Sequence, residues 1–333
     1  MSIRHATVRQ LQIFVAAARS QSFARTAEQF RLTPGAISFQ IKQIEGLCGF
    51  ALFERVGRHV VLTEAGSGLL EHASLVLQAL EAADQRMQAL KGLTGGHVTI
   101  GLVSTAKYFV PHILSRFQAE RPGVQVHLQD GNRREVNAAI IRGDIDLAVM
   151  GRPPQEAELE ARSFAPHPSV IICAPAHPLA GAAPMPLSAL AGQPFVAREE
   201  GSGTRALMER FFQDHGFTPT VVMTSSSNET IKQAVMAGIG IALISRHTIG
   251  LELGLGLLRI LPVQSLPLMR AWFVVHRRTM PLLPVHAQLK TFLMEKGGAI
   301  IEEIDAGYRA MGGRWRRAPD PDDVPHGPSV MPP

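Results

Sequence analysis

The sequence has few of the features that mark exported, membrane-bound or disulfide-stabilised proteins. It contains two cysteines, Cys48 and Cys173, which lie far apart in the chain and have no metal-ligating neighbours. Such cysteines are expected to be small buried hydrophobic residues in a reducing cytoplasm. Met1–Gln10 lacks the charged and then apolar segments of a secretory signal. No apolar run reaches about 18 residues, the length needed to span a membrane. The sequence therefore predicts a cytoplasmic protein without membrane contact.

Motifs that would support an enzyme are also missing. Gly201-Ser202-Gly203 is not followed by the Gly-Lys-Ser/Thr of a Walker loop. The Gly-x-Gly steps at 238–240 and 254–256 lack the third glycine and the acidic residue of a dinucleotide fingerprint. The thirteen histidines form neither a His-Glu-x-x-His motif nor a Cys/His cluster, and no Gly-x-Ser-x-Gly elbow is present. We therefore expect no catalytic residues, no metal site and no cofactor.

The basic charge of the chain is concentrated at one end. The 333 residues, 46 % of them hydrophobic, are sufficient for two or three domains with real cores. The formal net charge is +5, and residues 1–62, with eight Lys or Arg and three Glu, carry the same +5. The rest of the chain therefore sums to zero. Such a local basic segment is typical of a DNA-binding module.

Within this basic end, residues 25–55 predict a helix, a tight turn and a second helix. Thr33 and Pro34 give the second helix a strong start, because Thr caps free amides and Pro fits the first helical position. Ile37, Ile41 and Ile44 then form one buried stripe. A helix with one buried stripe and a polar, basic outer face suits the major groove of DNA. The alternative is an ordinary helical hairpin with a solvated outer face, which the local charge disfavours.

The residues expected to contact DNA lie on this helix pair and on a wing that follows it. Leu52–Leu62 predicts a hairpin with Gly57 in its turn, and its arginines would reach a phosphate or a minor groove. The predicted DNA-binding residues are Arg25, Thr33, Pro34, Gly35, Ser38, Phe39, Lys42, Arg55 and Arg58.

Residues 63–91 predict one long helix of roughly 40 Å, at about 1.5 Å per residue. Apolar residues recur along it at alternating intervals of four and three: Leu69, Ala73, Val76, Leu80, Ala83, Met87 and Leu90. Such a seam indicates pairing with a second copy of the helix, so we expect a dimer. The alternative is an amphipathic helix packed on its own domain. Residues 94–96, Thr-Gly-Gly, predict a hinge.

From residue 97 onward, strand and helix signals alternate, which predicts an α/β fold with parallel sheets in two lobes. Lobe I comprises residues 94–165 and 268–300, and lobe II residues 166–267, with chain crossings near 164–169 and 265–268. The predicted strands are 97–103, 124–129, 146–150, 170–174, 195–197, 220–224, 239–244 and 270–276. The predicted helices are 106–120, 133–142, 204–215, 229–237 and 284–306. The Pro- and Gly-rich segment in 301–333, after the last helix, is expected to be a disordered tail, and its arginines a solvated charge run.

Ligands of doubly wound folds bind at the carboxyl ends of the strands, here between the lobes. Hydroxyl groups, glycines and arginines follow several predicted strands, where backbone amides and guanidinium groups can hold an anion. The predicted effector-binding residues are Ser104, Thr105, Arg152, Ser202, Thr204, Arg205, Ser226 and Asn228. For each Ser, Thr or Asn before a helix, the alternative is helix capping alone.

An ordered set of residues resembles the winged helix-turn-helix of LysR-type transcriptional regulators. The matching positions are Ala27, Phe30, Leu32, Thr33, Ile37, Ser38, Ile41, Ile44, Glu45, Leu52–Arg55 and Leu62–Gly66. Pro34-Gly35 and Phe39 depart from the residues most frequent in that family. The resemblance covers roughly residues 6–300. It implies a head (1–62), a dimerisation linker helix (63–93) and a two-lobed, periplasmic-binding-protein-like effector domain (94–300).

The resemblance also implies partners and a function. The partners are double-stranded promoter DNA with half-sites near one helical turn apart, a small anionic effector, RNA polymerase and other copies of the chain, as a homodimer or a dimer of dimers. Met150–Pro154, Gly201–Arg205 and Arg4–Thr7 are similar to the Calvin-cycle branch, the RuBisCO operon regulators. That branch implies activation of carbon fixation genes and a phosphorylated metabolite or NADPH as effector. The alternatives are a LysR-type regulator of another metabolic operon, with a different anionic effector, and a cytoplasmic solute-binding or sensor protein without a specific DNA target.

Overall fold

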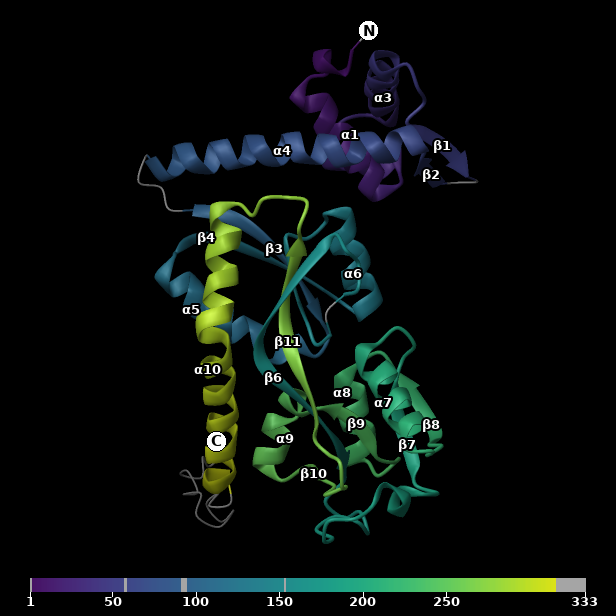
Figure 1. Ribbon diagram of the computed structural model, residues 1–333, viewed down its shortest axis with the longest axis vertical. Coiled ribbons are helices and arrows are strands. Elements are labelled where there is room, and N and C mark those ends of the chain that lie inside the picture. Colours follow the sequence, from purple (N-terminus) through teal and green to yellow (C-terminus); the bar gives the residue numbers. More distant parts are fainter. Residues whose placement is uncertain (1, 57–58, 91–94, 153, 316–333) are drawn as a thin grey trace, which may run out of the picture.

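The computed structural model describes residues 2–56, 59–90, 95–152 and 154–315 of the chain. The molecule is elongated, with a helical head, a long linker helix and two α/β lobes arranged along its length (Figure 1). The predicted wing residues Gly57 and Arg58, the hinge residue Thr94 and the predicted tail from residue 316 lie outside the described residues.

The head contains the helix pair and hairpin that the sequence predicts. Its elements are η1 (Ile3–His5), α1 (Val8–Ser20), α2 (Phe23–Phe30), α3 (Pro34–Cys48), β1 (Phe53–Val56) and β2 (His59–Leu62). The amide of Ala36 donates a hydrogen bond to Thr33 Oγ1 at 3.2 Å, so Thr33 caps α3. Ile37, Ile41 and Ile44 are buried in the core of the head, which confirms the predicted stripe.

The head and the start of the linker helix α4 (Glu64–Leu90) form one packed unit. Leu69 and Ala73 of α4 belong to the hydrophobic core of the head. Gly66 allows this close approach, because a Cβ at this position would lie 2.1 Å from the carbonyl oxygen of Leu52. Any side chain at Gly66 would therefore push the linker helix away from the head.

Further along α4, the predicted seam is exposed. Val76 is 46 %, Leu80 45 % and Met87 51 % exposed to solvent. These apolar side chains lie on one face of the helix, and the described part of the chain does not cover them. An apolar stripe of this kind supports pairing with a second linker helix.

Lobe I follows the predicted order of strands and helices. Its elements are β3 (Gly95–Val103), η2 (Ala106–Tyr108), α5 (Val110–Glu120), β4 (Gly123–Gly131), α6 (Arg133–Arg142) and β5 (Leu147–Met150). The strand β3 pairs in parallel with both β4 and β5. The predicted helix over 106–120 is divided into η2 and α5, because Pro111 lacks an amide proton and favours the start of a helix.

Lobe II contains one two-stranded sheet, two further strands that belong to the larger sheet running through both lobes, and several helices. Its elements are η3 (Leu187–Leu190), β7 (Pro194–Arg198), α7 (Gly203–Asp214), β8 (Thr220–Ser225), α8 (Asn228–Met236), β9 (Ala242–Ser245), η4 (Arg246–Thr248), α9 (Gly250–Leu255) and β10 (Arg259–Ile260). Strand β9 begins at Ala242 rather than at 239. Gly240 passes so close to Pro194 that a Cβ there would lie 2.3 Å from the Pro194 carbonyl oxygen.

The prediction of purely parallel sheets is wrong for the part that joins the lobes. The crossings occur at long strands, β6 (Leu159–Cys173) and β11 (Leu268–Arg277). The whole of β11 pairs antiparallel with residues 159–169 of β6, with one register shift between Trp272 and Phe273. The sheet order is β10-β6-β11-β5-β3-β4, with β9 also on β6. One mixed sheet therefore runs through both lobes (Figure 1). Alternating strand and helix signals could not reveal this, because both crossings lie between strands that are distant in sequence.

The last helix, α10 (Pro284–Trp315), extends past the predicted end at 306. It continues along lobe II because α9 packs against it. A Cβ at Gly250 would lie 2.4 Å from Tyr308 Cδ2, and Arg246 forms an ion pair with Asp305. Among the described residues, no helix has the combination of length and apolar character that crossing a membrane requires.

Stacked rings fill the junction between the lobes. Trp272 stacks on His167 with ring centroids 3.8 Å apart, and its Nε1–H donates a hydrogen bond to His247 Nδ1 at 3.0 Å. His247 must be neutral to accept this bond. Burial is the main cause that lowers the pKa of His247 to about 4, from an ordinary value near 6.5.

We predict that replacing Leu80 with lysine breaks the dimer. A charge in the seam has no partner, so the dissociation constant of the dimer should rise about a hundredfold or more, which is roughly 3 kcal/mol. Sedimentation velocity at micromolar protein measures the change. Glu71→Lys, which places the same charged side chain at an exposed position away from the seam and changes the net charge even more, is the control. A Leu80→Lys protein that remains as dimeric as the control would contradict a seam contact.

We also predict that His247 makes the protein less stable in mild acid. Its pKa is lower in the folded than in the unfolded chain, so the unfolded chain takes up the proton first as the pH falls below about 6.5. The free energy of unfolding should therefore decrease from about pH 6.5 down to the folded pKa of about 4. Between about pH 7.5 and 5.5 the loss should be about 1 kcal/mol smaller in His247→Gln, which keeps an acceptor for Trp272. Urea unfolding followed by circular dichroism measures it; equal losses in both proteins would refute the assignment.

Candidate functional site

The outer face of α3 presents polar, basic and aromatic side chains together. Phe39 is 58 % exposed, Lys42 and Gln43 are exposed, and Ser38 is half-buried. Gln10 Nε2 of α1 donates a hydrogen bond to Gln43 Oε1 at 2.9 Å, which fixes one edge of this face. An exposed phenyl ring beside a lysine can contact thymine methyl groups while the lysine meets a phosphate or a guanine.

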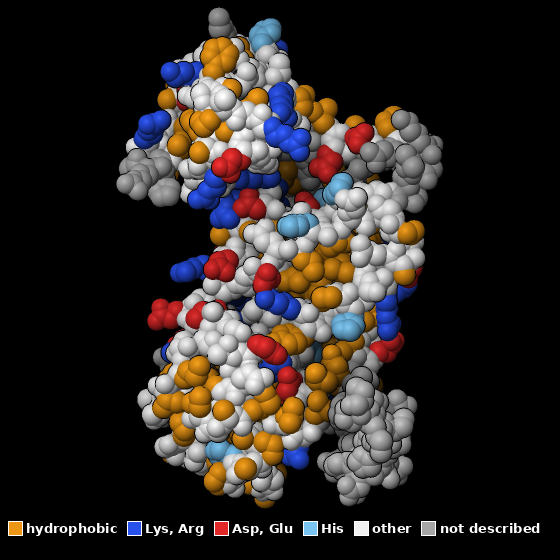
Figure 2. All heavy atoms as spheres, turned by 180° about the vertical axis from the view of Figure 1, so that it is seen from behind, with side chains coloured by type: hydrophobic (Ala, Val, Ile, Leu, Met, Phe, Trp, Pro, Cys, Tyr) orange, Lys and Arg blue, Asp and Glu red, His pale blue; other side chains and the backbone are white. Residues whose placement is uncertain are grey.

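The remaining predicted DNA-binding residues surround this face. Thr33, Pro34 and Gly35 form the exposed start of α3, Arg25 is exposed on α2, and Arg55 is exposed on β1. The head carries several Lys and Arg side chains over its surface (Figure 2). The structure thus brings the described members of the predicted set onto one module, as a major-groove reader with a wing requires.

A second site lies in the cleft between the two lobes, where residues of both lobes line a small cavity. The ends of β3, β5 and β7, the starts of α6 and α7, and the paired strands β6 and β11 all contribute to it. Its lining residues are Val103, Ser104, Thr105, Asn132, Arg133, Gly151, Arg152, His167, Arg198, Ser202, Gly203, Thr204 and Arg270. A cavity of this kind is the default place for a small ligand.

Three of the arginines in this cavity, Arg133, Arg152 and Arg270, form no ion pair with the described residues, and the charge of Glu156 offsets that of Arg133 only in part. The Nε atoms of Arg133 and Arg270 are buried and have no hydrogen-bond partner there. Burial, followed by the charge of Arg152, lowers the pKa of Arg133 and lowers that of Arg270 to about 10. Buried donors on like charges are costly unless an anion binds them. The arrangement is therefore suited to a small anion.

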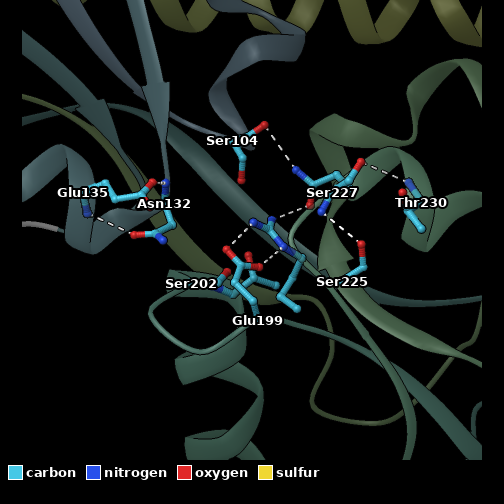
Figure 3. A network of polar contacts seen from close by, with 11 residues as sticks. Ser104, Asn132, Glu135, Glu199, Ser202, Ser225, Ser227 and Thr230 are labelled. Atoms are coloured by element: carbon cyan, nitrogen blue, oxygen red, sulfur yellow. Dashed lines mark hydrogen bonds and ion pairs between the residues drawn. The ribbon is translucent and has the colours of Figure 1, made fainter.

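The fourth arginine, Arg198, has a different environment. It is 3 % exposed, and Glu199 accepts from both its Nε and its Nη2, at 2.8 and 3.0 Å (Figure 3). Its Nη1 donates to Asn228 Oδ1 at 2.6 Å, and Asn228 Nδ2 in turn donates to the carbonyl oxygen of Ser104 at 3.2 Å. Arg198 is therefore already paired within lobe II, and it orients Asn228, which makes the hydrogen bond to lobe I.

Helix starts add positive potential to the cavity. Asn132 Oδ1 accepts from the amide of Glu135 at 3.0 Å, which completes a capping box at the start of α6 (Figure 3). Ser202 Oγ accepts from the amide of Thr204 at 3.2 Å at the start of α7. Ser202 and Thr204 are buried there. The amino ends of both helices favour a negatively charged ligand.

Sequence reasoning found part of this set. Ser104, Thr105, Arg152, Ser202 and Thr204 line the cavity. The hydroxyl groups of the helix starts were recognisable because Ser and Thr precede predicted helices after predicted strands.

The other predicted effector residues lie elsewhere. Ser226 and Asn228 line an adjoining hollow of the same cleft, together with Ser104. The structure does not bring Arg205 to either hollow: its Nε donates to Glu209 Oε1 at 2.5 Å, one helical turn further along α7. The Arg205–Glu209 spacing of four residues was visible in the sequence as a helical ion pair.

Arg133, His167 and Arg270 were missed. Arg133 is the first residue of α6, so its position at the start of a predicted helix that follows a predicted strand was an available signal. His167 and Arg270 lie opposite each other in the ladder of β6 and β11, which local pattern does not reveal. Gly151 lies against His167, since a Cβ there would be 2.3 Å from His167 Nδ1. No group of three or more His, Cys, Asp or Glu in the described chain could hold a metal ion.

Two family models match the chain, one over the head with the first residues of α4 and one over the two lobes. Residues 8–67 match the model described as "Bacterial regulatory helix-turn-helix protein, lysR family", and residues 91–298 match "LysR substrate binding domain". The first contains helix α3. The second contains the cavity between the lobes.

Similar proteins cover nearly the whole chain. It is 47 % identical over 293 residues to the HTH-type transcriptional regulator CfxR of Cupriavidus necator, which covers 88 % of this chain and 92 % of the relative. It is 40 % identical over 292 residues to the RuBisCO operon transcriptional regulator of Allochromatium vinosum, with 88 % and 97 % covered. Among solved structures, the regulatory domain of CcmR from Synechocystis in complex with 2-PG is 34 % identical, with a TM-score of 0.58 over 60 % of this chain and 96 % of that one.

The paired domains, the long matches to named regulators and the architecture of head, linker helix and effector lobes agree. The chain belongs to the LysR family of transcriptional regulators.

Proposed function

We propose that this protein acts in the cytoplasm as an activator of RuBisCO and other carbon fixation genes, and that it responds to a small phosphorylated effector bound between its lobes. The proposal of an effector rests on one observation. Arg133, Arg152 and Arg270 converge on one cavity and have no ion-pair partner among the described residues. The gene target is supported by the relatives, one of which is named for the RuBisCO operon.

The chemistry of the cavity favours a phosphate over a neutral ligand. Guanidinium groups bind phosphate through paired, charge-assisted hydrogen bonds, and the starts of α6 and α7 add backbone dipoles of the same sign. The hydroxyl groups of Ser104, Thr105 and Thr204 would accept and donate around it. The structure with 2-PG belongs to a 34 % identical regulator, and we infer a related phosphorylated acid or sugar here. NADPH is a further candidate of the same charge.

The mechanism we infer links this cavity to DNA through movement of the lobes. An anion that contacts Arg133 on lobe I and Thr204 on lobe II stabilises the closed arrangement of the cleft. In a dimer or a dimer of dimers, closure changes the relative positions of the heads and hence the bend in the promoter DNA. RNA polymerase then responds to the altered DNA. Arg25, Lys42 and Arg55 supply salt-dependent affinity, and Ser38 and Phe39 read the bases.

A second candidate is a LysR-type regulator of another operon with a different anionic effector. The cavity supports it equally, because charge complementarity does not select one phosphorylated compound. The departures at Pro34-Gly35 and Phe39 concern base reading, so the DNA target distinguishes the two candidates. Specific binding to DNA upstream of its own gene that does not respond to carbon fixation metabolites would favour this second candidate.

We predict that replacing Lys42 with alanine weakens binding to promoter and random DNA alike. If Lys42 contacts a phosphate, the slope of log affinity against log salt should become less steep by about 0.9, because one fewer counterion is released. Fluorescence anisotropy over a salt series measures this slope. Lys296→Ala, which removes a lysine of α10 that pairs with Glu120, should leave the slope unchanged. An unchanged slope in Lys42→Ala would remove this residue from the DNA interface.

We predict that replacing Arg270 with glutamine weakens binding of the effector about 10- to 100-fold, because charge-assisted hydrogen bonds are lost. The effector-dependent change in DNA affinity should disappear, while effector-free binding to DNA from upstream of its own gene remains. Calorimetric titration with 2-PG and anisotropy with and without it measure the two effects. Arg205→Gln is the matched control, since Arg205 pairs with Glu209 outside the cavity. Equal responses in Arg270→Gln and wild type would refute the cavity as the effector site.

A further inference from the structure

A small polar contact joins the DNA-reading head to lobe I. Arg19, near the end of α1, donates from Nη2 to the carbonyl oxygen of Gly143 at 2.6 Å, and its Nε lies 3.4 Å from Asp144 Oδ1. The linker helix contributes one further bond, from Gln78 Nε2 to the carbonyl oxygen of Pro281 at 2.9 Å.

Apolar packing does not reinforce this contact. The core of the head and the core of lobe I are separate clusters. Between them lies a hollow lined mainly by the head, including Arg9 and Arg31, with Gln129 and Asp144 on the side of lobe I. Figure 2 shows Lys and Arg side chains on the side of the head that faces lobe I. A boundary held by a few exposed polar bonds beside a hollow can open without exposing a core.

On the lobe I side of the contact, the conformations of Gly143 and Asp144 are fixed by their neighbours. Gly143 ends α6 in the left-handed conformation, with φ of +77°, and a Cβ there would lie 2.6 Å from Arg277 Nη2. Asp144 is held from behind by Arg142, whose Nε donates to Asp144 Oδ2 at 2.8 Å. Asp144 therefore faces Arg19 with a fixed carboxylate rather than a mobile one.

The helix that ends at this contact begins in the effector cavity. Arg133 and Arg142 are the first and last residues of α6, a rod of about 15 Å at about 1.5 Å per residue. Val136 and Ile140 bury one side of this rod in the core of lobe I. A helix transmits displacement along its axis because its length is fixed by its backbone hydrogen bonds. The amino end of α6 faces the cavity and its carboxyl end holds the head.

We infer that Arg19 is a positioning residue that docks the DNA-reading head on the carboxyl end of α6, so that an anion at the amino end of the same helix alters the placement of the head. The first half of the inference, docking, stands on the contact itself. The second half, coupling to the anion, rests on the proposed function. The head and the first turns of α4 move as one unit, because they share a core.

The docking half is tested without any ligand. Spin labels at Glu28→Cys on α2 and Ser115→Cys on α5, both exposed, report the distance between head and lobe I after Cys48 and Cys173 are replaced by serine and alanine. Labelled chains are diluted into unlabelled protein so that distances within one chain dominate. Wild type should give one narrow distance distribution, and Asp144→Asn a broadened or shifted one.

The matched control is Glu303→Gln, which removes an acidic partner of Arg116 on the far side of lobe I. It should give the wild-type distribution. Arg19→Gln removes the bond to the Gly143 carbonyl oxygen as well as the pair with Asp144, and it should broaden or shift the distribution further. If both Arg19→Gln and Asp144→Asn match the control, Arg19 does not dock the head and the inference is overturned.

The coupling half is tested by the ratio of DNA dissociation constants with and without 2-PG. In Asp144→Asn this ratio should fall at least threefold toward one, while the dissociation constant for 2-PG itself changes less than twofold by calorimetry. A merely structural role would alter both or neither. A full wild-type ratio in Asp144→Asn would overturn coupling through α6. Absence of 2-PG binding to wild type would instead count against the proposed effector, and the label distances would still decide the docking.

Discussion

The antiparallel ladder between β6 and β11 is the constraint on which the effector domain depends. It runs from the pair Leu268–Ser169 to the pair Arg277–Leu159, so one continuous pair of strands belongs to both lobes. Because backbone hydrogen bonds fix its register, the lobes cannot slide past each other, and relative motion is restricted to bending and twisting of two strands. The ladder also places His167 opposite Arg270, which sets two walls of the cavity at once.

Around this ladder, polar and apolar groups have separate tasks. Trp272 and His247 form a neutral, stacked junction whose hydrogen bond needs an unprotonated imidazole. The charged groups are kept on the cavity side, where Arg198 is neutralised by Glu199 and the other arginines are not. Burial lowers the pKa of His167 well below its ordinary range, with Arg270 and His247 as further causes, so the ring does not add to the positive charge. The proposed selectivity for an anion would thus come from guanidinium groups without an ion-pair partner rather than from total charge.

Local sequence signals predicted the elements that are defined locally. Helix α6 was predicted with its observed bounds, because Asn132 and Glu135 form a capping box and Gly143 ends the helix. The buried stripe of α3 and the cap at Thr33 were equally readable. The mixed sheet was not, since antiparallel pairing of β6 with β11 joins residues about a hundred positions apart. The cavity was found in outline through its helix starts, whereas Arg270 needed the ladder to reach it and Arg205 was diverted by Glu209 within its own helix.

The close approach of the linker helix to the head at Gly66 helps to set the spacing of the two heads of a dimer along DNA. With the linker helix pressed against the carbonyl oxygen of Leu52, the head cannot swivel on the start of α4. In two chains paired along the exposed seam, the distance between the two α3 helices is then set by the point at which the two linker helices cross. A longer side chain at Gly66 would therefore change the distance between the two α3 helices without contacting a base, a phosphate or the ligand.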